Sequence, residues 1–297
     1  MRIYDRAIPE SSIDSLNDRV KSDLHHALNA IATIEGRFVV NDTLWFIKRG
    51  TGKITPCVMN KANFISKRFQ DSLRDDRGWE KEKTLAGQTI DNYLEIKTSG
   101  SRYRLPPDTS FLEFFQEHCK EAVPADLRKE FLAMWHQYVK LGLGHLSSID
   151  ASKHGLFEKV DVNDRLKIGL EFETGNIASA FRSLDKLESL FVGDHIDFGV
   201  FVTSINKANA AARIWPQSNR NGSFAELENR NYHNNLTVPL WEFGFEPDEF
   251  KQDAAYFNGT TLYFPRVTGR TETGEDGIEY EVYLREDEEI LKPVTRL

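Results

Sequence analysis

The sequence predicts an α/β protein with a mixed central β-sheet flanked by helices. Four apolar runs have the length of β-strands: residues 156–162, 166–172, 198–202 and 237–243. An amphipathic segment at 177–192 carries apolar residues every three to four positions and lies between two of these runs. A chain that passes through a hairpin, a helix, a strand, a long loop and another strand is typical of a mixed sheet covered by helices.

The length and composition indicate one large domain of a globular protein. The chain has 297 residues, of which 40% are hydrophobic and 28% charged. It contains no apolar run of the roughly 18–20 residues that a membrane helix needs. The two cysteines, Cys57 and Cys119, are too few for a disulfide framework or a zinc site. The first residues lack the apolar stretch of a signal peptide, so we expect a cytoplasmic protein.

The net charge of −8 is unevenly distributed along the chain. Residues 272–289 hold many acids against Arg285 alone, whereas residues 48–83 are rich in lysine and arginine. The acids of the first segment are Glu272, Glu275, Asp276, Glu279, Glu281, Glu286, Asp287, Glu288 and Glu289. The rest of the chain is therefore close to neutral, which permits nucleic-acid binding without demonstrating it.

The N-terminal part of the chain predicts two helices and several strands. Apolar residues recur at helical spacing over residues 12–34, and a second helix is expected at 60–75. Residues 37–56 predict strands around a turn at Arg49-Gly50-Thr51-Gly52, and further strands are expected within 88–104.

The rest of the chain continues the pattern. Helices are expected to begin near Pro106 and Pro124, and Asn163-Asp164-Arg165 predicts a hairpin turn between the runs at 156–162 and 166–172. Further hairpins are expected at 254–284. We expect a single domain over residues 1–297: N-terminal helices and strands at 1–110 wrapped on the core, a catalytic core at 111–246, and an acidic β-rich extension at 247–297.

Acidic residues on the predicted hairpin indicate a metal site. Glu171 and Glu173 point to the same side of a strand, and antiparallel pairing across the turn is expected to bring Asp161 beside Glu171. Three converging carboxylates favour a cation between them, and Mg²⁺ prefers such oxygen ligands. The alternative is the solvated face of an ordinary hairpin. The apolar strand around Glu171 favours the metal site, since solvated charges are unwelcome there.

The residues around these acids resemble a known family. Residues 160–176, VDVNDRLKIGLEFETGN, are similar to the active-site hairpin of the BglII and BstYI restriction endonucleases, which belong to the PD-(D/E)XK nuclease superfamily. The likeness continues through FRSLDKL at 181–187 and HIDFGVFV at 195–202. It implies a restriction-endonuclease-like fold in a type II enzyme of bacteria or archaea. Such an enzyme would be a homodimer that uses Mg²⁺ to hydrolyse double-stranded DNA at a short, palindromic site.

The resemblance also assigns roles to the acids. Glu173 stands where the superfamily usually has lysine, and this Glu-x-Glu pattern resembles that of BamHI. By that likeness Asp161 and Glu171 bind the metal, and Glu173 acts on the attacking water. The predicted turn is one residue longer than in BstYI, so Asp164 competes with Asp161 for the metal-ligand role.

Residues that contact DNA are expected in the polar segment after residue 204. Arginine suits guanine and asparagine suits adenine in the major groove. The candidates are Lys207, Asn209, Arg213, Asn219, Arg220 and Asn221. Lys48, Arg49, Lys53, Lys61, Lys67 and Arg68 are candidates for phosphate contacts. Two other functions stay open: a DNA-binding protein of the same fold without cleavage, and a glycosidase that uses a carboxylate pair.

Overall fold

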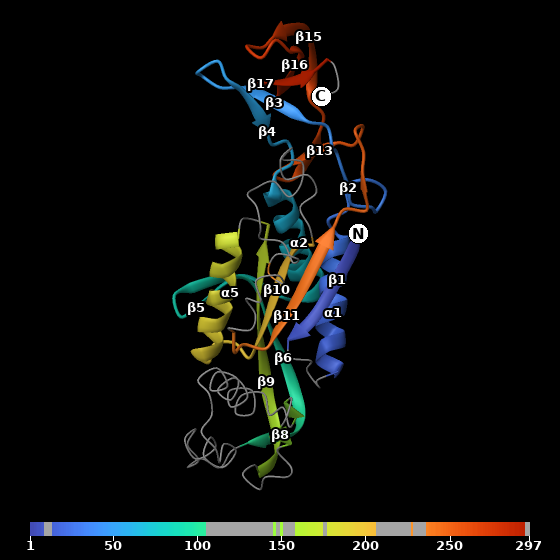
Figure 1. The fold of residues 1–297 in the computed structure, drawn as a ribbon. Helices are drawn as coiled ribbons and strands as arrows, with labels where there is room; N and C mark the ends of the chain where they lie inside the picture. Colours follow the sequence, from blue (N-terminus) through green and yellow to red (C-terminus); the bar gives the residue numbers. More distant parts are fainter. Residues whose placement is uncertain are drawn as a thin grey trace.

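Two β-sheets organise the chain. The computed structural model describes residues 1–8, 14–104, 145–146, 149–150, 158–174, 177–205, 227 and 236–294. A six-stranded sheet forms the body of the molecule, and a five-stranded sheet forms a smaller lobe beyond one end of it (Figure 1). The predicted α/β fold with a mixed central sheet and flanking helices is confirmed.

The central sheet has the strand order β1-β11-β10-β9-β6-β5. β9 and β11 pair with β10 in parallel, whereas β1 and β6 pair with their neighbours in the antiparallel sense. The strands are β1 (Arg2–Ile8), β5 (Glu80–Leu85), β6 (Gln88–Arg104), β9 (Glu158–Glu173), β10 (Phe198–Ser204) and β11 (Leu240–Glu246). Because β1, β5 and β6 come from residues 1–110, the sheet also draws strands from outside the range expected for the catalytic core.

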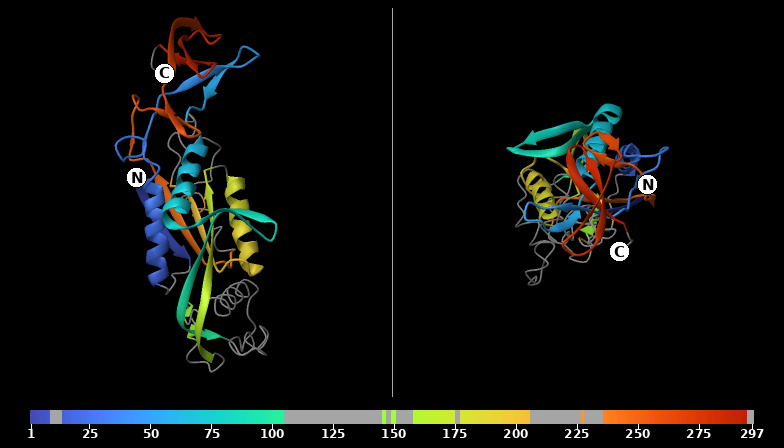
Figure 2. Two further views of the ribbon diagram at one scale, coloured as in Figure 1. Left: turned by 180° about the vertical axis from the view of Figure 1, so that it is seen from behind. Right: turned by 90° about the horizontal axis from the view of Figure 1, so that it is seen from above.

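Helices cover both faces of this sheet (Figure 2). α1 (Asp14–Asn29) and α2 (Ala62–Arg77) pack on one face, and α5 (Ile177–Val192) packs on the other. β10 is buried along its whole length, and its residues alternate between the two cores. Val200 and Val202 join the core under α1 and α2, while Phe201 joins the core under α5. These helices match the predictions at 12–34, 60–75 and 177–192.

The predicted hairpin turn at Asn163-Asp164-Arg165 is wrong. β9 runs without interruption from Glu158 to Glu173. It pairs with β6 at the positions where the turn was expected, with Asp164 opposite Thr98 and Asn163 opposite Ser99. Turn-favouring residues therefore lie within a strand, because the long ladder with β6 outweighs their local preference. The hairpin partner of β9 is β6, a strand that precedes it by more than fifty residues.

We call residues 45–57 and 266–293 the end lobe. Its sheet has the order β15-β16-β17-β3-β4, with β3 (Trp45–Lys48), β4 (Ile54–Cys57), β15 (Arg266–Thr273), β16 (Glu279–Arg285) and β17 (Glu288–Pro293). β3 and β4 surround the predicted turn at 49–52. Acids of the 272–289 segment form ion pairs with basic side chains of the lobe. Lys48 pairs with Glu272 at 3.6 Å, and Arg285 pairs with Glu288.

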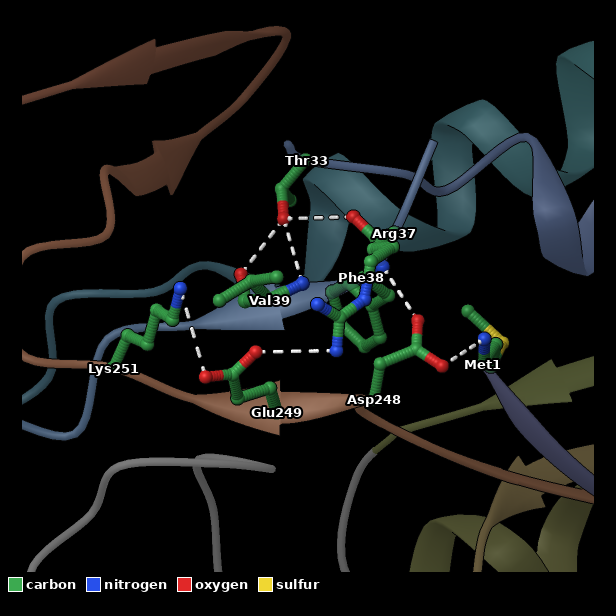
Figure 3. A network of polar contacts seen from close by, with 8 residues as sticks. All are labelled: Met1, Thr33, Arg37, Phe38, Val39, Asp248, Glu249 and Lys251. Carbon is green, nitrogen blue, oxygen red and sulfur yellow. Dashed lines mark hydrogen bonds and ion pairs between the residues drawn. The ribbon is translucent and has the colours of Figure 1, made fainter. Parts of the chain in front are cut away.

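Short strands and polar contacts join the body to the end lobe. β2 (Val39–Val40) pairs with β12 (Glu249–Phe250), and β13 (Tyr256–Asn258) pairs with β14 (Thr261–Tyr263). Beside β2 and β12, Asp248 accepts hydrogen bonds from the Phe38 N–H, at 2.8 Å, and from the amino group of Met1 (Figure 3). Arg37 pairs with Glu249 at 3.1 Å. This junction ties two segments that lie far apart in the sequence.

Some predicted elements lie elsewhere. The helices expected to begin near Pro106 and Pro124 fall outside the described residues, while two short strands, β7 (His145–Leu146) and β8 (Ile149–Asp150), pair with each other. Within the part of the chain that the structure covers, no helix has the length and apolar character required to cross a membrane.

Candidate active site

Glu171 is a buried carboxylate on the face of the central sheet that α5 covers. Its residue is 4% exposed, and its Oε1 lies 2.7 Å from the Nζ of Lys186 on α5. Burial raises the pKa of Glu171 to about 7, and the negative charge of Asp91 acts in the same direction. Hydrogen bonds from Lys186 and Ser183 oppose this shift. A buried carboxylate at the end of an apolar strand is suited to binding a cation, because a bound cation favours its charged form.

Asp91 on β6 lies opposite Glu171 on the neighbouring strand β9. Asn92 pairs with Leu170 in the antiparallel register, which places the preceding Asp91 opposite Glu171. Asp91 Oδ2 accepts a 2.7 Å hydrogen bond from the Phe172 N–H. Burial raises the pKa of Asp91, as does the charge of Glu82, while the Phe172 N–H, Lys186 and Gln70 oppose the rise. Two carboxylates with raised pKa values therefore lie close together here, and the charge of Asp91 disfavours ionisation of Glu171.

Two further acids border this pair. Glu173 is the last residue of β9, lies opposite Thr203 of β10, and is partly exposed. The alternation of a strand places it on the same face as Glu171. Glu82 lies opposite Asp91 in the register of β5 and β6, is exposed, and has a left-handed backbone with φ of 53°.

The structure does not bring Asp161 beside Glu171. Both belong to β9, ten residues apart, which corresponds to about 33 Å along an extended strand. The backbone of Asp161 pairs with Ser101, and its side chain, like that of Asp164, is not among those described. The predicted convergence of Asp161 with the two glutamates is therefore wrong, because it depended on a turn that β9 does not contain.

Asp91 is the residue that the sequence analysis missed. The signal was present, since Thr89-Ile90-Asp91-Asn92-Tyr93-Leu94 sets an acid within a strand that has apolar neighbours, as around Glu171. The six predicted DNA contacts, from Lys207 to Asn221, all lie in 206–226, outside the described residues.

A comparison with family models covers this part of the chain. The model of the restriction endonuclease BamHI matches residues 6–245, most of the chain. The chain belongs to the BamHI restriction endonuclease family. No curated protein matches the chain. The match includes β5, β6, β9 and β10 in full, parts of β1 and β11, and Asp91, Glu171 and Glu173, whereas β15, β16 and β17 of the end lobe lie beyond it.

Membership of the BamHI family establishes the chain as a nuclease that binds double-stranded DNA and acts at a specific site. Restriction endonucleases of this family generally use divalent metal ions. Among the described residues, no three His, Cys, Asp or Glu side chains form a ready-made metal-binding group. Asp91 and Glu171 nevertheless fit Mg²⁺, because this ion is usually held by one or two carboxylates and completes its shell with waters and phosphate oxygens.

A shallow, open cavity adjoins Lys186 on the α5 side. It has a volume of about 510 Å³ and is lined by Gln88, Thr89, Arg182, Asp185, Lys186 and Ser189. Lys186 connects it to the site, because its ammonium reaches both Glu171 and the backbone carbonyl of Thr89, at 2.8 Å. In a BamHI-family nuclease, a cavity lined by two basic residues is suited to a phosphate of the DNA backbone.

Proposed function

We propose that this chain is a type II restriction endonuclease that uses Mg²⁺ to hydrolyse phosphodiester bonds of double-stranded DNA at a short palindromic site. The observation that carries the proposal is the pairing of Asp91 with Glu171, two buried or half-buried carboxylates at the end of the central sheet. Two such carboxylates are costly to ionise without matching positive charge, and Lys186 supplies only one, which supports a metal site over a purely structural role.

In this proposal Asp91 and Glu171 hold the metal and Glu173 acts on the attacking water. When bound, the metal ion neutralises charge on the phosphate and lowers the pKa of a coordinated water. Glu173 would orient the attacking water and accept its proton. The water oxygen forms a bond to phosphorus as the bond from phosphorus to the leaving oxygen breaks, and the leaving oxygen takes up a proton from solvent. The charge of Glu82 raises the pKa of Asp91, so Glu82 adds negative charge beside this pair of carboxylates.

Sequence recognition is proposed for the segment that follows β10. β10 ends at Ser204 beside the end of β9, so the chain that leaves it begins next to the carboxylates. Lys207, Asn209, Arg213, Asn219, Arg220 and Asn221 stay the predicted DNA-contacting residues of this segment. A homodimer is proposed because a two-fold axis presents the same protein surface to each half of a palindrome.

Digestion of DNA of known sequence tests the proposal. The wild-type protein is expected to produce discrete fragments with Mg²⁺ and none with EDTA, and sequencing of the fragment ends gives the recognition site. Glu171→Ala is expected to abolish cleavage while specific DNA binding persists. Glu95→Ala, on a neighbouring strand, serves as the matched control and is expected to cleave normally. Cleavage in EDTA, or full activity of Glu171→Ala, would contradict the proposal.

A further inference from the structure

Lys186 lies between Glu171 and the cavity beside α5. Its Nζ is 2.7 Å from Glu171 Oε1 and 2.8 Å from the backbone carbonyl oxygen of Thr89. The side chain is 28% exposed, so its ammonium is neither fully buried nor fully solvated. α5 fixes the backbone position of Lys186, since Leu184 and Leu187 of the same helix are fully buried in the core under it.

The acids on β6 and β9 create a need for positive charge. Asp91, Glu171 and Glu173 are all acidic, so neither strand contributes a cation at the end where they meet. Hydrolysis of a phosphodiester builds up negative charge on the phosphate oxygens, and a positioned cation lowers the free energy of that transition state. Lys186 is the cation that the described structure places against Glu171.

The contact of Lys186 with Glu171 bears on how a metal ion could bind there. The Lys186 ammonium lies 2.7 Å from Oε1, so a metal ion that bound the same oxygen would compete with it. We propose that Lys186 is a catalytic residue that gives up Glu171 to the metal and then binds a phosphate oxygen of the DNA in the cavity beside α5. This inference rests on the proposed function, because it requires a metal at Glu171 and DNA as the substrate.

The lining of the cavity supports this second position. Arg182 lies one helical turn before Lys186 and lines the same space, so two basic side chains face a single acid, Asp185. Gln88 and Ser189, joined by a 3.2 Å hydrogen bond, add polar groups that suit phosphate oxygens. A lysine chain is long and flexible enough to turn its ammonium from Glu171 into this adjoining space.

Calorimetric titration with Ca²⁺, in the absence of DNA, separates this role from a structural one. Removing a competing charge a few ångströms from the metal position is expected to tighten Ca²⁺ binding about tenfold in Lys186→Met at pH 8.5. The same variant is expected to cleave DNA on the order of a hundredfold more slowly at saturating Mg²⁺, and Lys186→Arg is expected to restore part of this loss. Lys186→Gln retains a donor for the Thr89 carbonyl and replaces Lys186→Met in the test if the methionine variant folds poorly. It is expected to show the same tighter Ca²⁺ binding and slower cleavage.

Lys167→Met is the matched control. Lys167 belongs to β9 of the central sheet, and its ammonium, like that of Lys186, donates to a backbone carbonyl, that of Asp194 at 3.4 Å. It should leave both Ca²⁺ affinity and cleavage unchanged. If the wild-type protein binds Ca²⁺ and cleaves DNA while both Lys186→Met and Lys186→Gln bind Ca²⁺ no more tightly than it does, the role of Lys186 would be overturned and the proposed function would stand. A wild-type protein that neither binds Ca²⁺ nor cleaves DNA would overturn the proposed function, and this inference with it.

Discussion

The carboxylate of Asp91 accepts a 2.7 Å hydrogen bond from the backbone N–H of Phe172, the residue that follows Glu171. This contact joins two strands whose residues are 81 positions apart in the sequence. It fixes the Asp91 carboxylate next to the Glu171 carboxylate at the point where the ladder between β6 and β9 ends. The candidate site of this BamHI-family protein is therefore assembled across two strands by their register.

The first prediction separates Asp91 from Asp161. Asp91→Asn removes a carboxylate from the proposed metal site while leaving an acceptor for the Phe172 N–H, so the fold should persist. We expect metal-dependent cleavage to fall by roughly a hundredfold or more, as measured by steady-state digestion of plasmid DNA. Asp161→Asn is the control, since its position lies about 33 Å along β9 from Glu171, and it is expected to cleave at the wild-type rate. The reverse pattern would restore Asp161 as the metal ligand.

The second prediction concerns the pH dependence of stability. The folded pKa of Glu171 is raised from 4.5 to about 7, so the native state binds a proton there that the unfolded state has released. The free energy of unfolding therefore decreases as the pH rises from about 4.5 to 7 because of this residue. Glu171→Gln should remove that loss, and in EDTA it should be more stable than the wild type at pH 8 by about 1–3 kcal/mol.

Urea unfolding at pH 5 and pH 8 measures this difference. The stabilisation by Glu171→Gln should be present at pH 8 and small at pH 5. Glu95→Gln provides the contrast, because hydrogen bonds from Arg165 and Tyr93 lower the pKa of Glu95. Its replacement should reduce stability at neutral pH rather than increase it. An equal effect of Glu171→Gln at both pH values would show that ionisation of Glu171 does not limit stability.

The two central acids of the candidate site, Glu171 and Asp91, differ in how well the sequence predicts them. Glu171 could be identified because an acid within an apolar strand stands out locally, and the helix after it was predicted with its correct bounds. Asp91 could not be placed beside Glu171, because β6 and β9 are far apart in the sequence. Local sequence patterns do not reveal the register in which two such strands pair. Asn163, Asp164 and Arg165 have turn-favouring chemistry, and their strand conformation depends on that distant partner.

The end lobe shows the same limit. Hairpins were predicted at 254–284, and their strands are present. The sequence did not indicate that β17 would pair with β3, more than two hundred residues earlier, through Leu291 and Phe46. Local alternation predicts a strand but carries no information about which distant strand will pair with it.

The third prediction is that the acidic C-terminal strands are structural. Ile290 on β17 is fully buried with Trp45, Ile47 and Met59 in the core of the end lobe. Ile290→Ala should lower the stability of the lobe by about 2–5 kcal/mol, because it leaves a cavity in that core. Trp45 fluorescence reports the change, since its ring packs edge-on against Tyr283 with centroids 4.9 Å apart. Val294→Ala, at an exposed position on the same chain segment, should have little effect, and similar losses in both variants would contradict the assignment.

The last prediction concerns the junction of the body and the end lobe. Burial alone would raise the pKa of Asp248, but hydrogen bonds from the Met1 amino group and the Phe38 N–H outweigh it, so the pKa is lowered. A lowered folded pKa contributes stability at neutral pH that is lost as the pH falls through that pKa. Asp248→Asn should therefore lower the free energy of unfolding by about 1–2 kcal/mol at pH 7. The difference from the wild type should shrink below about pH 4, where the unfolded aspartate also protonates.

Thermal unfolding at pH 7 and pH 3.5 checks this expectation, with Asp253→Asn as the matched control. Asp253 is exposed a few residues further along the same segment, so its loss should leave the melting temperature nearly unchanged. A deficit of Asp248→Asn that is as large at pH 3.5 as at pH 7 would mean that the side chain acts through shape and hydrogen bonding alone. A deficit confined to neutral pH would show that the charge of Asp248 holds residues 37–38 against the start of β12.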